Sequence, residues 1–206
     1  MDYRRPVEAL VPGVQGRVLG VLARAGTDLT MRAVADLAGV SPQQASVVIG
    51  RLVELGVVER RDVPPASLVR MAPDNVAAQA VVAIAGLRRA ALARLAAMAA
   101  DISPAPASLV VFGSFARGEA HLGSDLDVLV VRPPGLPGDD DSWTDSLGSW
   151  ADRASRVVGN PVNLVEASSE ELPALLRREG PSVWRNAATE GVVLIGSPLT
   201  DMASVA

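Results

Sequence analysis

The stretch GSFARGEAHLGSDLDVLVV, Gly113–Val131, decides the fold of the second half of the chain. A Gly-Ser pair opens it directly after the apolar run SLVVF, 108–112, and it ends in a second apolar run headed by Asp125 and Asp127. Both runs are predicted to be buried strands, with a short helical turn between them. Successive strand residues point to opposite faces, so the two aspartates are predicted on one face and Leu126 on the other.

Two carboxylates at this spacing repel each other unless a cation lies between them. Mg²⁺ prefers oxygen ligands and typically takes one or two carboxylates together with substrate phosphates. Glycine at the start of a helical turn lets an anion approach the backbone N–H groups, and Ser114 adds a hydroxyl donor. Gly113, Ser114, Asp125 and Asp127 therefore predict a site for a nucleoside triphosphate with a divalent metal, Mg²⁺ or Mn²⁺.

The whole pattern, GS, ten residues and then D-x-D between two apolar runs, resembles the DNA polymerase beta–like nucleotidyltransferase superfamily, most closely its minimal bacterial branch. The phrases ARG at 116–118, SDLD at 124–127 and WRNAATEGVVLIG at 184–196 strengthen the resemblance, which covers residues 100–197. It implies transfer of a nucleoside monophosphate to an acceptor hydroxyl. It also implies that Asp125 and Asp127 hold metal and that the nucleotide contacts Gly113, Ser114, Arg117 and Ser124.

The pattern departs from the superfamily at its third carboxylate, whose position falls on Asn163 in PVNLVE, 161–166. An amide offers an oxygen to Mg²⁺ but no charge, so the metal that activates the acceptor should be held more weakly. Glu166 faces the other side of an unbulged strand, although a bulge would bring it into the site. Asp125, Asp127 and Asn163 are therefore the candidate catalytic residues.

The front of the chain reads as three helices and a hairpin. Helices are expected over 13–26, over 31–40 after the cap Thr30, and from the N-cap Ser41 to Gly56. Two β-prone runs, 57–63 and 67–72, flank Pro64-Pro65, and the proline pair predicts a loose hairpin tip. The residues of the second helix that are expected to face the core are Val34, Leu37 and Val40.

This order resembles the winged helix-turn-helix family over residues 12–72. The resemblance implies that the third helix enters the DNA major groove. Gln pairs well with adenine, and Arg neutralises phosphates. The candidate DNA-binding residues are Gln43, Gln44, Ser46, Arg51, Arg60 and Arg61. Winged helices also mediate protein interaction and dimerisation, which is the alternative for this half.

The Ala-rich segment 74–98 predicts one long connecting helix, and strands alternating with helices follow from Asp101. The fold class is therefore α+β with α/β-like character: a winged helix-turn-helix domain at 1–73, a connecting helix at 74–100, and a nucleotidyltransferase domain at 101–206 with a small mixed sheet flanked by helices. Trp143, Trp150 and Trp184 are expected to be core anchors.

Composition excludes some chemistry. The 206 residues include no Cys, so disulfides and thiolate metal sites are excluded. No signal peptide or long apolar span is evident, so a cytoplasmic protein without a membrane partner is expected.

Two functions stay open. The first, favoured narrowly by the complete GS and D-x-D parts, is a Mg-dependent nucleotidyltransferase with a DNA-binding winged helix, acting on a protein, an RNA or a small molecule. The second, favoured by Asn163, is a winged-helix regulator whose second domain binds nucleotide or a partner without catalysis. A toxin–antitoxin setting suits either, with a toxin or a modification target as protein partner and a second copy of the chain as a further partner.

Overall fold

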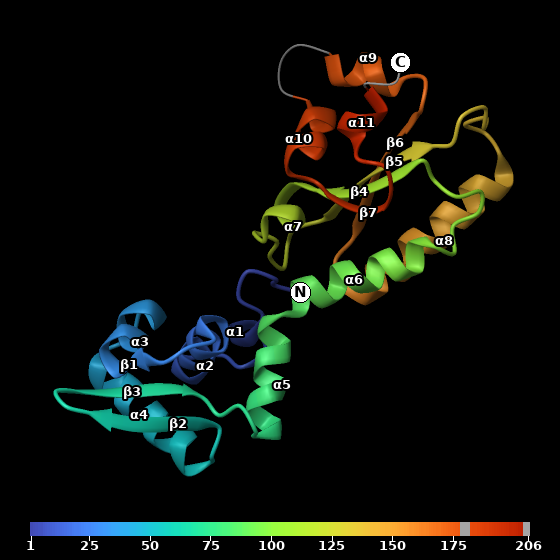
Figure 1. The fold of residues 1–206 in the computed structure, drawn as a ribbon. Helices are drawn as coiled ribbons and strands as arrows, with labels where there is room; N and C mark the ends of the chain where they lie inside the picture. Colours follow the sequence, from blue (N-terminus) through green and yellow to red (C-terminus); the bar gives the residue numbers. More distant parts are fainter. Residues whose placement is uncertain (178–181, 204–206) are drawn as a thin grey trace. The chain divides into compact units, whose positions relative to one another are not determined.

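The computed structural model describes residues 1–177 and 182–203, which form two compact units (Figure 1). The first unit comprises residues 4–87 with Asp2, and the second comprises the described residues from 88 onward with Met1 and Tyr3. Each unit has an apolar core of its own.

The first unit consists of short helices and a three-stranded antiparallel sheet in the order β1-β3-β2. The predicted helices and hairpin are present, and the short helix α1 was not predicted. Its elements in chain order are α1 (Pro6–Leu10), α2 (Val14–Ala25), β1 (Leu29–Thr30), α3 (Met31–Ala38), α4 (Pro42–Glu54), β2 (Val58–Val63), β3 (Ala66–Met71) and α5 (Val76–Ala85).

Caps fix where the helices of this unit begin. The Thr30 side chain accepts a hydrogen bond from Ala33 N and starts α3 as predicted. Ser41 starts α4 through a capping box: its hydroxyl accepts from Gln44 N, and the Gln44 side chain accepts from Ser41 N. Each such cap satisfies N–H groups that the helix itself leaves unpaired.

Two sequence expectations are wrong in this unit. Leu37 is 66% exposed, because Val34, Ala35 and Ala38 fill the side of the two-turn helix α3 that faces the core. The hairpin tip is tight, since the ladder between β2 and β3 continues to the pair Val63 and Ala66. The prolines between them lie outside the ladder, where no N–H donor is required.

The predicted long connecting helix is two helices, α5 and α6 (Leu87–Ala99), separated at Gly86. Glycine is the weakest ordinary residue in a helix interior, by about 1 kcal/mol relative to Ala. Each half packs in a different core: Ala78 of α5 is buried in the first unit, and Leu95 of α6 is buried in the second. Within the described residues no single helix is long and apolar enough to cross a membrane; only this broken pair reaches that length and composition.

The second unit contains the predicted small mixed sheet, which has four strands in the order β6-β5-β4-β7. Strands β5 and β6 are parallel, and the other two pairs are antiparallel. After α6, its elements are β4 (Ser108–Phe112), α7 (Gly113–Arg117), β5 (Leu126–Arg132), α8 (Asp141–Val158), β6 (Val162–Ser168), α9 (Leu172–Arg177), α10 (Val183–Glu190), β7 (Val192–Gly196) and α11 (Leu199–Ala203).

Helices cover both faces of this sheet, with α6 and α8 on one face and α9, α10 and α11 on the other (Figure 1). All five residues of β4 are buried, and the last four, Leu109 to Phe112, are apolar. Trp143 and Trp150 of α8 are fully buried and Trp184 of α10 is nearly so, which confirms them as core anchors. The sequence SSEELPALLRREG, 168–180, predicts a further helix, which is observed as α9, and residues 178–180 of that prediction lie outside the described residues.

Candidate functional site

The predicted site forms where the tips of three strands meet. Asp127 of β5 is in register with Phe112, the last residue of β4, on one side and with Asn163 of β6 on the other. The Asn163 Nδ2 donates a hydrogen bond to Asp127 Oδ1 at 3.1 Å. Asn163 therefore lies beside Asp127, in the place that the sequence pattern assigned to the third carboxylate.

Gly113 brings the Gly-Ser turn against the same carboxylate. Its φ is +67°, a conformation that glycine adopts without steric cost. A Cβ atom added to Gly113 would lie 2.6 Å from Asp127 Oδ2, closer than real Cβ contacts come. Both the positive φ and the closeness of Asp127 thus require glycine at this position. The Gly-Ser turn and the D-x-D motif lie next to each other.

Asp125 and Ser114 complete the predicted set at this edge of the sheet. Asp125 is exposed and immediately precedes β5, whereas Asp127 is half-exposed within it. Ser114 is the second residue of α7 and is half-buried. Within residues 1–177 and 182–203 its hydroxyl has no hydrogen-bond partner, so it is available to a ligand.

Arg117 and Ser124, the other predicted nucleotide contacts, already have partners. The Arg117 guanidinium pairs with Glu119 at 2.8 Å and with Glu190 at 2.6 Å, and these hydrogen bonds, Glu119 first, raise its pKa. The Ser124 hydroxyl accepts from His121 N at 3.0 Å and closes the turn before Asp125. Neither side chain is directed freely at the site. His121 is exposed in this turn.

Glu166 does not replace the missing carboxylate. The register of β5 with β6 is continuous over all seven pairs, so no bulge turns Glu166 toward Asn163. Glu166 Oε1 instead accepts hydrogen bonds from Arg132 at 2.5 Å and from Trp143 Nε1 of α8 at 3.0 Å. In the described parts of the chain no three His, Cys, Asp or Glu side chains gather as a metal-binding group.

The donor set fits one hard cation carried with a triphosphate. Two carboxylates from Asp125 and Asp127 supply charged oxygens, and Asn163 supplies an amide oxygen once its side chain turns away from Asp127. Only two of these three residues carry a negative charge. The residues present thus suit a single Mg²⁺ or Mn²⁺ ion better than a pair.

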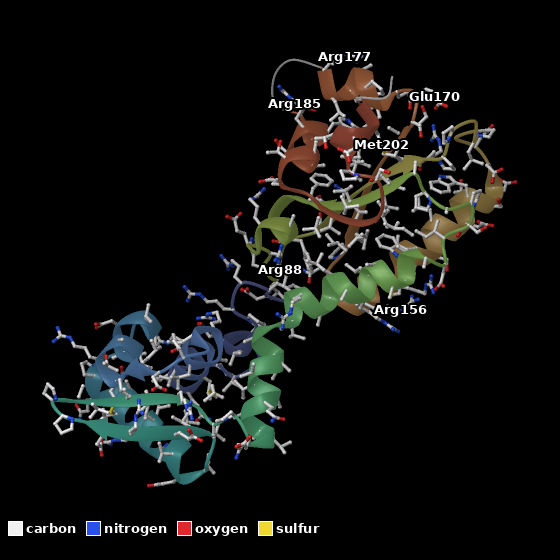
Figure 2. All side chains as sticks on the ribbon, viewed as in Figure 1. Arg88, Arg156, Glu170, Arg177, Arg185 and Met202 are labelled. Atoms are coloured by element: carbon white, nitrogen blue, oxygen red, sulfur yellow. The ribbon has the colours of Figure 1, made fainter. Side chains whose placement is uncertain are left out.

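Three supporting residues were not singled out from the sequence. Asn160 is 3% exposed, and its Nδ2 donates to the carbonyls of Ser124 and His121. Arg88, labelled in Figure 2, is the second residue of α6 and donates to the carbonyls of Phe115 and Ala116 near the end of α7. Tyr3 stacks at a tilt on Phe115, with ring centroids 4.7 Å apart, and donates its hydroxyl to Val158 O.

These residues gave no sequence signal because their contacts span 27 to 155 positions. A buried Asn is recognisable only once the fold shows which carbonyls it reaches. The one local hint is the sequence NPVN at 160–163, where Asn160 stands two residues before the strand of Asn163.

The candidate DNA-binding residues on α4 are all exposed, but their side chains are not all free to contact DNA. Gln43, Ser46 and Arg51 lie on the solvent face of the helix. Gln44 is exposed too, yet its side-chain oxygen is used by the capping box with Ser41. Gln43 is therefore a better candidate for reading a base than Gln44.

The arginines of the wing, which is the hairpin of β2 and β3, are paired with carboxylates. Arg60 pairs with Asp62 at 3.0 Å, and Arg61 pairs with Asp28 at 3.0 Å. Hydrogen bonds from Ser67 and then Arg60 lower the pKa of Asp62. The wing is nearly neutral rather than basic, and phosphate must compete with these acids for the arginines.

Two family models match the chain. Residues 11–66 match the MarR family, and residues 92–181 match the nucleotidyltransferase domain. The chain joins a MarR-type winged-helix domain to a nucleotidyltransferase domain. The predicted resemblances are thereby confirmed at both ends of the chain, and the Gly113–Asp127 site lies within the matched part of the nucleotidyltransferase domain.

No curated protein matches the chain. Among solved structures, a toxin–antitoxin with AMP-PNP is similar at 19% identity and a TM-score of 0.38, covering 55% of this chain and 82% of the other. A mutant of the MntA–HpeT toxin–antitoxin is similar at 18% identity, with the same TM-score and coverage.

Proposed function

We propose that the nucleotidyltransferase domain binds a nucleoside triphosphate with one divalent cation and transfers the nucleoside monophosphate to an acceptor hydroxyl. The observation that carries this proposal is the contact between Gly113 and Asp127, which joins the phosphate-binding turn to the carboxylates. A glycine turn beside acidic oxygens binds the two parts of a metal–triphosphate at once: backbone N–H groups receive phosphate, and carboxylates receive the cation.

The reaction follows from that arrangement. The acceptor oxygen attacks the α-phosphorus, a new P–O bond forms, the bond to the β-phosphate breaks, and pyrophosphate leaves while the hydroxyl proton passes to solvent. The cation, when bound, neutralises charge on the phosphates. Gly113 and Ser114 orient the triphosphate, and Asp125 and Asp127 hold the cation. Asn163 supplies no negative charge, so deprotonation of the acceptor is poorly assisted and transfer is slow.

A second function is favoured by Asn163 and by the engagement of Glu166 with Arg132 and Trp143. With only two carboxylates, the domain would bind nucleotide and the winged helix would bind DNA, so that the chain acts as a nucleotide-responsive regulator. The two functions share the binding site and differ only in whether a covalent product forms.

Labelled nucleotide separates these functions. The full chain is incubated with α-³²P-labelled nucleoside triphosphates, Mg²⁺ or Mn²⁺ and a bacterial lysate, and label in protein and RNA is counted. Slow transfer that disappears in Asp127→Ala and increases in Asn163→Asp supports the enzyme. No transfer by the natural chain, with transfer appearing only in Asn163→Asp, supports the regulator. No nucleotide binding by either form excludes both.

The remaining partners are proposals of the same kind. The winged helix is proposed to bind duplex DNA through the exposed face of α4. The acceptor is proposed to be a protein, an RNA or a small molecule. A toxin–antitoxin setting, with a toxin or modification target as protein partner, follows from the resemblance to the minimal branch of the superfamily. A second copy of the chain is proposed to pack on α5, where Val76 is 81% exposed. Cytoplasmic location suits these partners.

A further inference from the structure

The two aspartates of the site are held in different ways. Asp127 lies inside β5 and is paired with neighbouring strands on both sides, so the ladder fixes its backbone. Asp125 precedes Leu126, the first ladder residue, and is exposed. Its position must therefore be set by something other than the sheet.

Asn160 provides that support. Its Nδ2 donates to Ser124 O at 2.8 Å and to His121 O at 3.1 Å. The Ser124 carbonyl belongs to the peptide group that joins Ser124 to Asp125, so holding it fixes the peptide plane directly before Asp125. The second bond holds the other end of the turn, which the Ser124 hydroxyl closes onto His121.

The orientation of the Asn160 amide is set by its neighbours. Two carbonyl oxygens require the amide nitrogen to face them, because the reverse orientation would place oxygen against oxygen. The Asn160 Oδ1 accepts from the amino group of Met1 at 2.9 Å. With its Oδ1 occupied by the Met1 amino group and its side chain buried, Asn160 is not itself a ligand of the cation.

The same residue also connects the two strands that carry the oxygen donors. Asn160 stands two residues before β6, and its neighbour Pro161 accepts a hydrogen bond from Leu126 N at 2.7 Å. Hydrogen bonds of Asn160 and Pro161 thus join the start of β5 to the start of β6. The position of Asp125 relative to Asn163 depends on these hydrogen bonds.

We infer that Asn160 is a positioning residue that places Asp125 for cation binding beside Asp127 and Asn163. The inference rests on the proposed function, because it takes Asp125 as a ligand of the cation that accompanies the nucleotide. Residues that orient metal ligands typically contribute about 10- to 100-fold to metal affinity.

A double-mutant cycle on the full chain tests this inference. Calorimetry measures the affinity for ATP with Mn²⁺ and for ATP with a chelator, and the ratio gives the part that depends on the cation. Asn160→Ala should lower that ratio about 10- to 100-fold. Adding Asp125→Ala to Asn160→Ala should then change it less than about twofold, whereas adding Asp127→Ala should cost nearly its full single-variant factor.

Two further variants keep the result interpretable. Asn160→Asp has the same size as Asn and lacks the two N–H donors, so it should lower the ratio as Asn160→Ala does. Unfolding temperatures measured without ligand show whether each variant folds, and one folded variant is enough for the test. Asn186→Ala changes an exposed Asn on α10 and should leave the ratio unchanged.

The outcomes separate this inference from the proposed function. Wild-type ratios in folded Asn160 variants overturn the inference alone, as does a full additional loss from Asp125→Ala, which would show that Asn160 acts only on stability. A natural chain that binds ATP no better with Mn²⁺ than with chelator overturns the proposed cation site itself.

Discussion

At the scale of single residues, Gly113 is the most informative position of the site. Its positive φ and its contact with Asp127 each require glycine, and a matched control variant separates the two requirements. Gly135 has a similar φ of +76°, but an added Cβ there meets nothing within 4 Å. Alanine at either position forces the left-handed conformation, at a cost of about 1–2 kcal/mol; only alanine at Gly113 also displaces the Asp127 carboxylate.

We therefore expect Gly113→Ala to lower the affinity for ATP with Mn²⁺ at least about tenfold, since a displaced ligand loses its alignment with the cation. Gly135→Ala should lose comparable stability and bind nucleotide normally. Calorimetric titration and thermal unfolding of both variants measure the two effects. Equal nucleotide affinity in the two variants would show that the Gly113–Asp127 contact does not serve the site.

Residue-level prediction from the sequence succeeded where chemistry and spacing coincide. The placement of Asp127, Asn163 and Gly113 at one sheet edge follows from strand alternation and the turn between two apolar runs. Arg117 and Ser124 were assigned from resemblance alone, and the structure gives their side chains partners in Glu119, Glu190 and His121. Glu119 and His121 are close in sequence, whereas Glu190 lies 73 positions from Arg117 and leaves no mark on the local pattern.

At the scale of elements, the wing formed by β2 and β3 shows how charge pairing limits a surface. At each arginine there, a carboxylate of the protein and a phosphate of DNA compete for the same guanidinium group. Exposed ion pairs contribute only about 0–1 kcal/mol, so phosphate can displace them. The carboxylates nevertheless reduce the net positive field that attracts DNA.

Asp62→Asn should accordingly strengthen binding to duplex DNA and steepen its salt dependence, because Arg60 loses its acidic partner. The Arg60→Ala/Arg61→Ala double variant should weaken binding and reduce the salt slope by at most about two, roughly 0.9 for each phosphate that is no longer neutralised. Fluorescence anisotropy of a labelled duplex across salt concentrations measures both slopes. An unchanged slope in the double variant would place the phosphate-binding residues away from the wing.

The elements themselves were largely predictable, and the exceptions share a cause. Helix α4 begins where Ser41-Pro42 predicts it, and α8 ends at Gly159 in a left-handed cap. The continuous helix expected over 74–98 failed at Gly86 because two different cores compete for its halves. Local propensity does not report which core a segment will join.

At the scale of the whole molecule, the two compact units differ in their aromatic content. All six aromatic residues belong to the second unit, including Tyr3, so residues 4–87 contain no Trp, Tyr or Phe. The three buried tryptophans make intrinsic fluorescence a probe of the nucleotidyltransferase unit alone, whereas far-UV circular dichroism observes the helices of both units.

Thermal unfolding followed by both probes should therefore resolve the two binding activities. ATP with Mn²⁺ at about 100 times its dissociation constant adds about 2.7 kcal/mol of stability to the unit that binds it, which corresponds to a shift on the order of 10 °C in the fluorescence transition. Duplex DNA should shift only the part of the dichroism transition that fluorescence does not see. Asp127→Ala provides the control, since it should abolish the nucleotide shift and leave the DNA shift intact. If instead both probes show one coincident transition that either ligand moves equally, the two units unfold cooperatively, and each ligand stabilises the whole chain rather than only the unit that binds it.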